Sequence, residues 1–233
     1  MATLSVAATP GGWPRRLRYV LLVVWWRCVS VFPLWQTTAR FHLGNACYAY
    51  GRRSAALQAW EAAADAKQGH LKALHNLANG WLEAQRWPEA AAAYRRLGDA
   101  RGDASYAYLA GKCHFALNER QAAREDFERC IEIDPQHVGA LEHLGRLALV
   151  RRDGAAAHAL LLRALPHANN PQALHFLLGA ASELNRDPAA ALAHYREVQH
   201  EPLRAQAAAR LARIAAMAAA SANDLSPRSD HGH

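Results

Sequence analysis

The sequence is short of the residues that interrupt helices. Its 233 residues include only 14 glycines and 10 prolines, whereas hydrophobic residues make up 52% of the chain. Alanine, which is abundant here, is the best helix former, and glycine and proline are the worst. The composition therefore favours helix along most of a chain long enough for one or two globular domains or one short solenoid.

Motifs for catalysis, metal binding and cofactor binding are also missing. The four cysteines form no Cys-x-x-Cys pair, and the 13 histidines are scattered without a His-Glu-x-x-His motif. We expect Cys28, Cys47, Cys113 and Cys130 to be small buried residues in a reducing compartment. Since no nucleophile–base motif, phosphate loop or pair of carboxylates is visible, the sequence predicts no enzyme, no metal site and no cofactor.

Acidic residues are absent from the first quarter of the chain. Residues 1–60 hold seven arginines and no acid, and the remaining 20 basic residues balance 20 acidic ones, so the net charge of +7 lies at this end. The bias toward arginine and alanine indicates a GC-rich bacterial genome. Because the positive charge surrounds an apolar segment instead of following a groove, we predict no nucleic-acid partner.

What the sequence does contain is a repeat of 33 or 34 residues. An apolar residue followed by a small one recurs at Leu43-Gly44, Leu77-Ala78, Ala110-Gly111, Leu144-Gly145 and Leu178-Gly179. Each pair is followed, sixteen residues after its small member, by a large apolar residue: Trp60, Tyr94, Phe127, Leu161 and Tyr195. One such unit is two antiparallel helices that are too small to bury their own apolar face, so neighbouring units must stack.

The pattern resembles the tetratricopeptide repeat (TPR) family, whose 34-residue skeleton is W-x2-L-G-x2-Y, A-x3-F and P. The segments LGNACYAYG and AAREDFERCIEIDP carry the resemblance most clearly, although the Trp position holds Arg40, Leu74, Ala107, Leu141 and His175. The resemblance implies an all-α, right-handed helix-turn-helix TPR solenoid. It also implies a protein whose work is to bind another protein or a peptide.

The repeat divides the chain into segments. We expect a flexible N-terminus at 1–14, a basic and apolar helix at 15–36, five TPR units at 37–70, 71–103, 104–137, 138–171 and 172–204, a capping helix at 202–220 and a disordered tail at 221–233. The capping helix has a single apolar stripe that includes Leu203, Leu211 and Met217. The tail is polar and aperiodic, which is typical of disorder.

In TPR arrays the first helix of each unit lines a concave groove. The resemblance places in this groove Phe41, Asn45, Tyr48, Lys72, His75, Asn79, Tyr108, Lys112, Phe115 and Arg146. Asn45, Asn79, Lys112 and Arg146 occupy equivalent positions, where amides can bind a peptide main chain and cations can bind a carboxylate. The aromatic residues would supply apolar pockets. We therefore predict an extended or helical peptide ligand with acidic character; alternatively, these side chains only solvate an exposed helix face.

The segment before the repeats is basic and then apolar. Arg15, Arg16 and Arg18 precede the run from Tyr19 to Trp35, whose 17 residues span about 25 Å as a helix, less than the roughly 30 Å of a bilayer core. Arg27 interrupts this run, and no A-x-A cleavage site of a signal peptide follows it. A membrane-spanning helix, a helix lying in the membrane surface and a half-repeat packed on the first unit remain open.

The half-repeat alternative comes from an alignment without gaps. WWRCVSVFP aligns with FERCIEIDP of the third unit, and the positions of its charged outer face are then taken by Val23, Val24 and Trp26. Together with Arg15, Arg16 and Arg18, these form a predicted membrane or partner patch. We expect an adaptor tethered to the cytoplasmic face of a bacterial inner membrane. The alternative is a cytoplasmic scaffold whose N-terminal helix mediates oligomerisation or docking into a larger complex.

Overall fold

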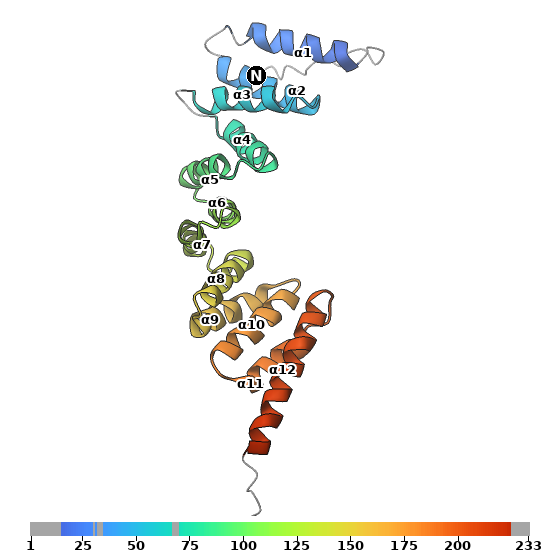
Figure 1. Ribbon diagram of the computed structural model, residues 1–233. Coiled ribbons are helices and arrows are strands. Elements are labelled where there is room, and N and C mark those ends of the chain that lie inside the picture. The colour runs from blue at the N-terminus through green and yellow to red at the C-terminus, as the bar shows by residue number, and fades with distance from the viewer. Residues whose placement is uncertain (1–14, 30, 32–34, 67–69, 225–233) are drawn as a thin grey trace, which may run out of the picture. The chain divides into compact units, whose positions relative to one another are not determined.

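The computed structural model describes residues 15–29, 31, 35–66 and 70–224, and these residues form twelve α-helices, one short 3-10 helix and no strand (Figure 1). The predicted flexible N-terminus at 1–14 and the last nine residues of the predicted tail lie outside this part of the chain. The helices are α1 (Arg15–Val29), α2 (Gln36–Ala49), α3 (Arg53–Ala64), α4 (Leu71–Glu83), α5 (Trp87–Arg101), α6 (Ala104–Ala116), α7 (Arg120–Ile133), α8 (Val138–Val150), α9 (Gly154–Ala164), α10 (Gln172–Leu184), α11 (Pro188–Arg196) and α12 (Leu203–Asp224).

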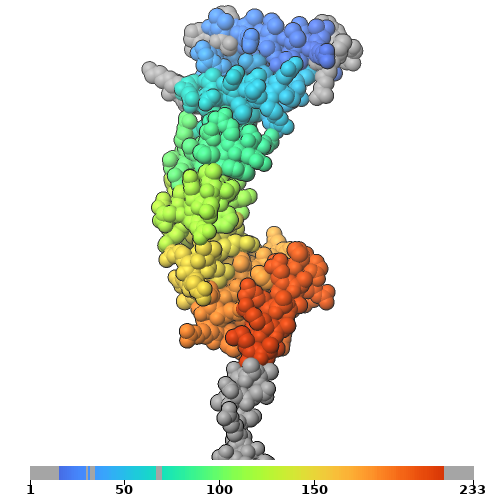
Figure 2. All heavy atoms as spheres, viewed as in Figure 1, coloured from blue at the N-terminus to red at the C-terminus, as the bar shows by residue number. Residues whose placement is uncertain are grey.

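The chain consists of two compact units, Met1–Glu119 and Arg120–His233. In the first unit α2 packs on α3 and α4 on α5, and in the second α8 packs on α9 and α10 on α11. One helix is added at an end of each unit. Figure 2 shows α1 lying against α2 in the first unit and α12 lying against the last helix pair in the second.

Every turn inside a repeat has the same backbone conformation. One residue, seven positions after the small residue of each repeat, has a positive φ between 57° and 77°: Gly51, Gln85, Asn118, Arg152 and Arg186. The next residue then donates its amide hydrogen to a carbonyl five residues earlier, as Arg86 does to Trp81 at 2.8 Å. This left-handed residue ends the first helix and satisfies its last carbonyls.

The small residue of the repeat lets the two helices cross closely. A methyl group added at Gly44 would lie 2.3 Å from Cδ1 of Trp60, and one added at Gly179 would lie 2.5 Å from Cε1 of Tyr195. The aromatic residues beneath are themselves almost fully buried, since Trp60 is 3% exposed and Tyr195 1% exposed. The glycine and the aromatic residue therefore form one packing contact between the paired helices.

Two predictions about local structure need correction. Cys47, Cys113 and Cys130 are buried as expected, but Cys28 is exposed because α1 turns a different face to α2. At the other end, α12 continues to Asp224, so Ser221–Asp224 are helical and not part of a disordered tail. The alanine-rich run carries the helix onward because the next proline is Pro227.

The apolar stripe of α12 is also shorter than predicted. Leu203, Ala207, Leu211 and Ile214 pack with Tyr195 in one cluster. Met217, the last residue of the predicted stripe, is instead 64% exposed.

Candidate functional site

The first unit contains a polar pocket between α2 and α4, called the α2–α4 pocket below. Its volume is about 380 Å³, and it is lined by Asn45, Tyr48, Trp60, Asn76, Asn79, Gly80 and Glu83. A second hollow of about 210 Å³ shares four of these residues and adds Arg53, Leu57 and Ala84. Both belong to the first two repeats, where α2 and α4 are the helices predicted to line the groove.

Asn45 is held in one orientation by the core. Its Oδ1 accepts a hydrogen bond from Trp60 Nε1 at 2.9 Å and another from Asn76 Nδ2 at 2.8 Å. Because an indole nitrogen only donates, the oxygen of the Asn45 amide must face Trp60. No hydrogen bond to another described residue uses Asn45 Nδ2 or Asn76 Oδ1, so the pocket offers a fixed donor beside a fixed acceptor.

Asn79 is held in the same way but has less left to offer. Its Oδ1 accepts from the Tyr94 hydroxyl at 2.7 Å, and its Nδ2 lies 3.0 Å from His75 Nε2. Since an amide nitrogen only donates, His75 Nε2 is the acceptor, and Nδ1 of the neutral ring carries the hydrogen toward the Tyr106 hydroxyl oxygen 3.3 Å away. Burial raises the pKa of Tyr94, which keeps its hydroxyl protonated. Asn79 and His75 therefore mainly make the wall of the α2–α4 pocket rigid.

The edge of the pocket carries two charges that neutralise each other. The Tyr48 hydroxyl donates to Glu83 Oε1 at 2.7 Å, and Arg53 Nη1 donates to Glu83 Oε2 at 2.8 Å. The Arg53 guanidinium also lies 4.0 Å from the centre of the Tyr48 ring, over its face. This arrangement fixes the Tyr48 ring beside the Asn45 amide and leaves no net charge at this edge.

Only three of the ten predicted groove residues line this pocket: Asn45, Tyr48 and Asn79. His75 lies behind the wall, while Phe41 stacks on His70 at 4.5 Å between ring centres. The other residues lie elsewhere: Lys72 and Phe115 are exposed, Lys112 lies over Tyr108, and Arg146 pairs with Glu142 in the second unit.

Sequence reasoning missed three polar or aromatic residues of the site. Asn76, Trp60 and Arg53 complete the pocket, and only one signal could have indicated any of them. Asn76 and Asn79 stand three positions apart on one helix, so their side chains must share a face.

The predicted N-terminal patch is rotated relative to the sequence alignment. Val23 packs against the core, and Trp26 stacks on His42 at 4.6 Å, so these two residues do not form an exposed patch with Val24. The Tyr19 ring, 5.2 Å from that of Tyr50, anchors α1 in this rotation. Exposed instead is a stripe, called the α1 stripe, of Leu17, Val20, Leu21, Val24 and Trp25.

The predicted basic residues of this patch differ in environment. Arg15 is the first residue of α1, Arg16 is exposed and Arg18 is half-buried. Within the residues that the structure describes, no helix is both long enough and apolar enough to cross a bilayer.

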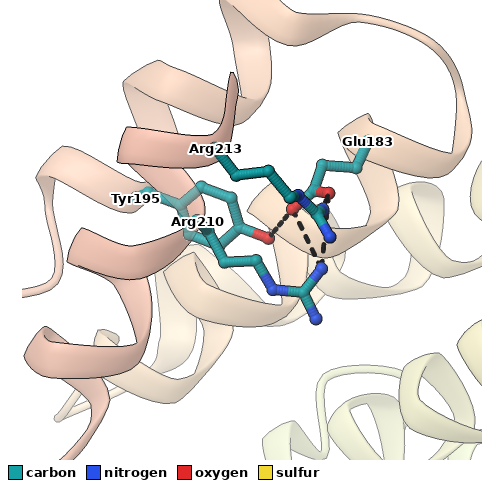
Figure 3. Close-up of polar contacts among 4 residues, drawn as sticks. All are labelled: Glu183, Tyr195, Arg210 and Arg213. Atoms are coloured by element: carbon teal, nitrogen blue, oxygen red, sulfur yellow. Dashed lines mark hydrogen bonds and ion pairs between the residues drawn. The ribbon is translucent and has the colours of Figure 1, made fainter. Parts of the chain in front are cut away.

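In the second unit, the position equivalent to Tyr48 is Glu183, and its carboxylate is fully engaged (Figure 3). The Tyr195 hydroxyl donates to Oε1 at 2.6 Å, Arg210 Nη1 lies 3.4 Å from each oxygen, and Arg213 forms a further ion pair. Both arginines come from α12. The last helix therefore covers a position that is open in the first unit.

Comparison with known proteins agrees with this repeat architecture. The family model of the tetratricopeptide repeat matches residues 104–137. A TPR repeat-containing protein from Halalkalibacterium halodurans is 30% identical over 167 residues, which cover 70% of this chain and 73% of that protein. The chain belongs to the tetratricopeptide repeat family, and its fold is the predicted all-α TPR solenoid. Members of this family are generally non-enzymatic scaffolds that bind proteins.

Solved structures share the fold at low sequence identity. MamA matches with a TM-score of 0.62 and 17% identity, over 70% of this chain and 90% of MamA. YrrB, described as a TPR protein with an unusual peptide-binding site, matches with a TM-score of 0.62 and 14% identity, over 74% of this chain and 91% of YrrB. A tetratricopeptide repeat protein from Parabacteroides merdae covers 91% of this chain with a TM-score of 0.56 and 18% identity.

Proposed function

We propose that this chain is a scaffold that binds an extended peptide segment of a partner protein in the α2–α4 pocket. The observation that carries the proposal is the oriented amide pair, in which Asn45 Nδ2 offers a donor and Asn76 Oδ1 offers an acceptor. One peptide group presents a carbonyl and an amide hydrogen, which is the complementary pair. The peptide-binding site described for YrrB, which shares this fold, supports a ligand of this class.

The pocket favours a ligand bound through its main chain over a strongly charged one. Glu83 and Arg53 already satisfy each other, and Lys112 and Arg146, on which the predicted acidic character rests, do not line the pocket. Tyr48 and Trp60 supply an aromatic floor for an apolar side chain of the ligand.

The test begins with a ligand search. Random dodecapeptides displayed on phage are selected on the full-length chain, and the affinities of the selected peptides are measured by fluorescence anisotropy. Asn45→Asp keeps the oxygen that Trp60 and Asn76 need but loses the Nδ2 donor, so affinity should fall by about tenfold or more. Asn170→Asp makes the same chemical change on the second unit, where Asn170 Oδ1 only accepts from the Gln172 amide, and should leave binding unchanged. Equal binding by Asn45→Asp and the wild-type chain would refute the proposed site.

A second candidate function is attachment to a membrane through α1. The α1 stripe includes Val24 and Trp25, which are 52% and 60% exposed, in a region of the chain that has arginines and no acid. Apolar and aromatic side chains beside arginines suit the surface of an anionic bilayer, where each arginine adds about 1 kcal/mol. This would place the scaffold at the cytoplasmic face of a bacterial inner membrane. The alternative is self-association or docking of a cytoplasmic scaffold through the same stripe.

Vesicle flotation separates these alternatives. The full-length chain is floated with vesicles containing anionic lipid, next to a Val24→Glu/Trp25→Glu double variant and a Val150→Glu control, whose residue is 54% exposed on α8. Attachment predicts that the wild-type chain and the control float and that the double variant stays at the bottom. If all three stay at the bottom, attachment is wrong, and light scattering of the same proteins tests self-association.

A further inference from the structure

Three histidines that are far apart in sequence meet in the second unit. His158 lies on α9, His175 on α10 and His194 on α11, and all three side chains are half-buried. The ring centres of His175 and His194 are 5.7 Å apart, and those of His158 and His194 are 6.2 Å apart. Their separations of 17 and 19 residues form no motif, so only the stacking of the repeat helices brings them together.

The two closest rings face each other through the same kind of nitrogen. Nδ1 of His175 lies 3.5 Å from Nδ1 of His194. A neutral imidazole has one N–H and one lone pair, so at most one of these nitrogens can donate to the other. Hydrogens on both Nδ1 atoms would point two N–H groups at each other. One ring can therefore donate Nδ1–H to the Nδ1 lone pair of the other, and a cation bound by both nitrogens would take the place of that shared proton.

The distance between the two nitrogens is close to that of two ligands on one ion. Imidazole nitrogens bind zinc at about 2.0–2.1 Å, which in a tetrahedral site puts two of them about 3.3 Å apart. The observed 3.5 Å differs from this value by about 0.2 Å, and both rings would have to turn so that their lone pairs converge on one ion.

We propose that His175 and His194 form a two-histidine site for a late first-row divalent cation such as Zn²⁺ or Cu²⁺. Imidazole suits these ions, whereas Mg²⁺ and Ca²⁺ prefer oxygen. Among the described residues no group of three or more His, Cys, Asp or Glu could hold a metal ion. The remaining coordination positions therefore belong to water or to a donor from a bound partner, and His158 is a neighbour of the site and not a third ligand.

The site is independent of the proposed peptide pocket, because it belongs to the other compact unit. It also differs from a structural zinc site, in which four protein ligands enclose the ion. With two protein ligands, the ion would exchange readily and keep positions open. A scaffold with such an ion can bind a histidine or carboxylate of a partner by coordination.

Metal binding can be measured directly on the full-length chain. Zn²⁺ is titrated against a chromogenic chelator in a His231→Ala/His233→Ala background, because the His-Gly-His end of the sequence supplies two further imidazoles. One equivalent of Zn²⁺ should bind, and His175→Ala or His194→Ala should each weaken it at least tenfold, since loss of an outer-shell partner alone costs about 10–100-fold. His158→Ala and His200→Ala, an exposed histidine of the same unit, should change the affinity less than about threefold.

Two results would overturn the proposal. One is the absence of saturable Zn²⁺ binding in the background chain, and the other is an equal loss on His158→Ala or His200→Ala. Imidazole ¹⁵N spectra supply a readout that does not depend on the chelator, because coordination moves the Nδ1 resonances of His175 and His194 and of no other histidine. Thermal unfolding of each variant without metal shows whether the helices remain intact.

Discussion

The second and fifth repeats contain the same type of hydrogen bond, but its acceptor has a different environment in each. In both, a buried tyrosine of the second helix donates its hydroxyl to a side chain of the first helix, from Tyr94 to Asn79 and from Tyr195 to Glu183. The amide of the second repeat remains at an open pocket, whereas the carboxylate of the fifth is covered by two arginines of α12. The buried tyrosine thus orients a polar side chain of the first helix in both repeats, although Asn79 and Glu183 occupy different positions of the repeat, and the two side chains face a pocket and a neighbouring helix respectively.

The largest expected effect comes from removing the close helix crossing of the first repeat, which supplies Asn45 to the same pocket. Gly44→Ala puts a methyl group 2.3 Å from the Trp60 ring, which must move and release Asn45. We expect a loss of about 2–3 kcal/mol in the free energy of unfolding and a loss of peptide binding. Gly98→Ala is the control, because its new methyl group would meet Tyr106 Cβ at an ordinary 3.7 Å. Urea unfolding should show Gly98→Ala unchanged or stabilised by about 0.5 kcal/mol.

The next effect separates the covered position from the open one. Glu183→Gln removes a carboxylate that is 18% exposed and holds Arg210 and Arg213, so we expect a loss of about 1–2 kcal/mol, smaller in high salt. The matched change in the first unit, Glu83→Gln, breaks a pair with Arg53 that is more than half exposed and should cost less than about 1 kcal/mol. Hydrogen exchange should be faster in α12 for Glu183→Gln and not for Glu83→Gln. Equal protection of α12 in both variants would mean that apolar packing alone holds that helix.

A smaller effect is expected from the buried hydroxyl of the second repeat. Tyr94→Phe deletes the donor to Asn79 without creating a cavity, so we expect a loss of about 1 kcal/mol. The Asn79 amide would then be held by His75 alone, and peptide affinity should fall. Tyr106→Phe, which removes a hydroxyl behind the wall, should affect peptide affinity less. Anisotropy and urea unfolding on both variants measure the difference.

The smallest effect is a dependence on pH. Burial lowers the pKa of His42 and of His70 below the ordinary value of about 6.5, with the mutual charge of the two rings adding to the effect at His42. Above that value both states are neutral. As the pH falls through it, the unfolded chain takes up protons first, so stability declines until the pH drops below the folded-state pKa. The urea concentration at the unfolding midpoint should therefore decrease as the pH is lowered from 7.5 to 5.5. The decrease should be smaller in His42→Phe, which keeps an aromatic ring against Trp26.

The repeat, the helices and the fold class could all be predicted from the sequence, because the small residue and the aromatic residue recur at fixed spacing. The rotation of α1 could not, because the alignment on Cys28 contains nothing of the contact between Tyr19 and Tyr50. The turn residues are similar. Gly51 and Asn118 suit a left-handed backbone, but Gln85, Arg152 and Arg186 adopt it because the repeat imposes it.

The pocket was predicted only in part for a related reason. Family resemblance assigns residues to a face one helix at a time, and it identified Asn45, Tyr48 and Asn79. Trp60 and Arg53 reach the pocket from α3, the second helix of the repeat. Such residues join a site through the packing of two helices, which spacing along one helix does not encode.

The contact of α12 bears on how this array could be lengthened. α12 packs on α11, where the first helix of a sixth repeat would begin, and Glu183 holds it there through two arginines. A repeat fused after Asp224 would meet the exposed side of α12, where Met217 and small alanines stand among Arg204, Gln206 and Arg213 and offer a smaller apolar surface than a repeat interface does. A duplicated repeat inserted between Arg196 and Leu203 would instead keep α12 as the last helix of the longer array. For a gene that grows by duplicating repeats, the permissive junction lies before α12 and not after it.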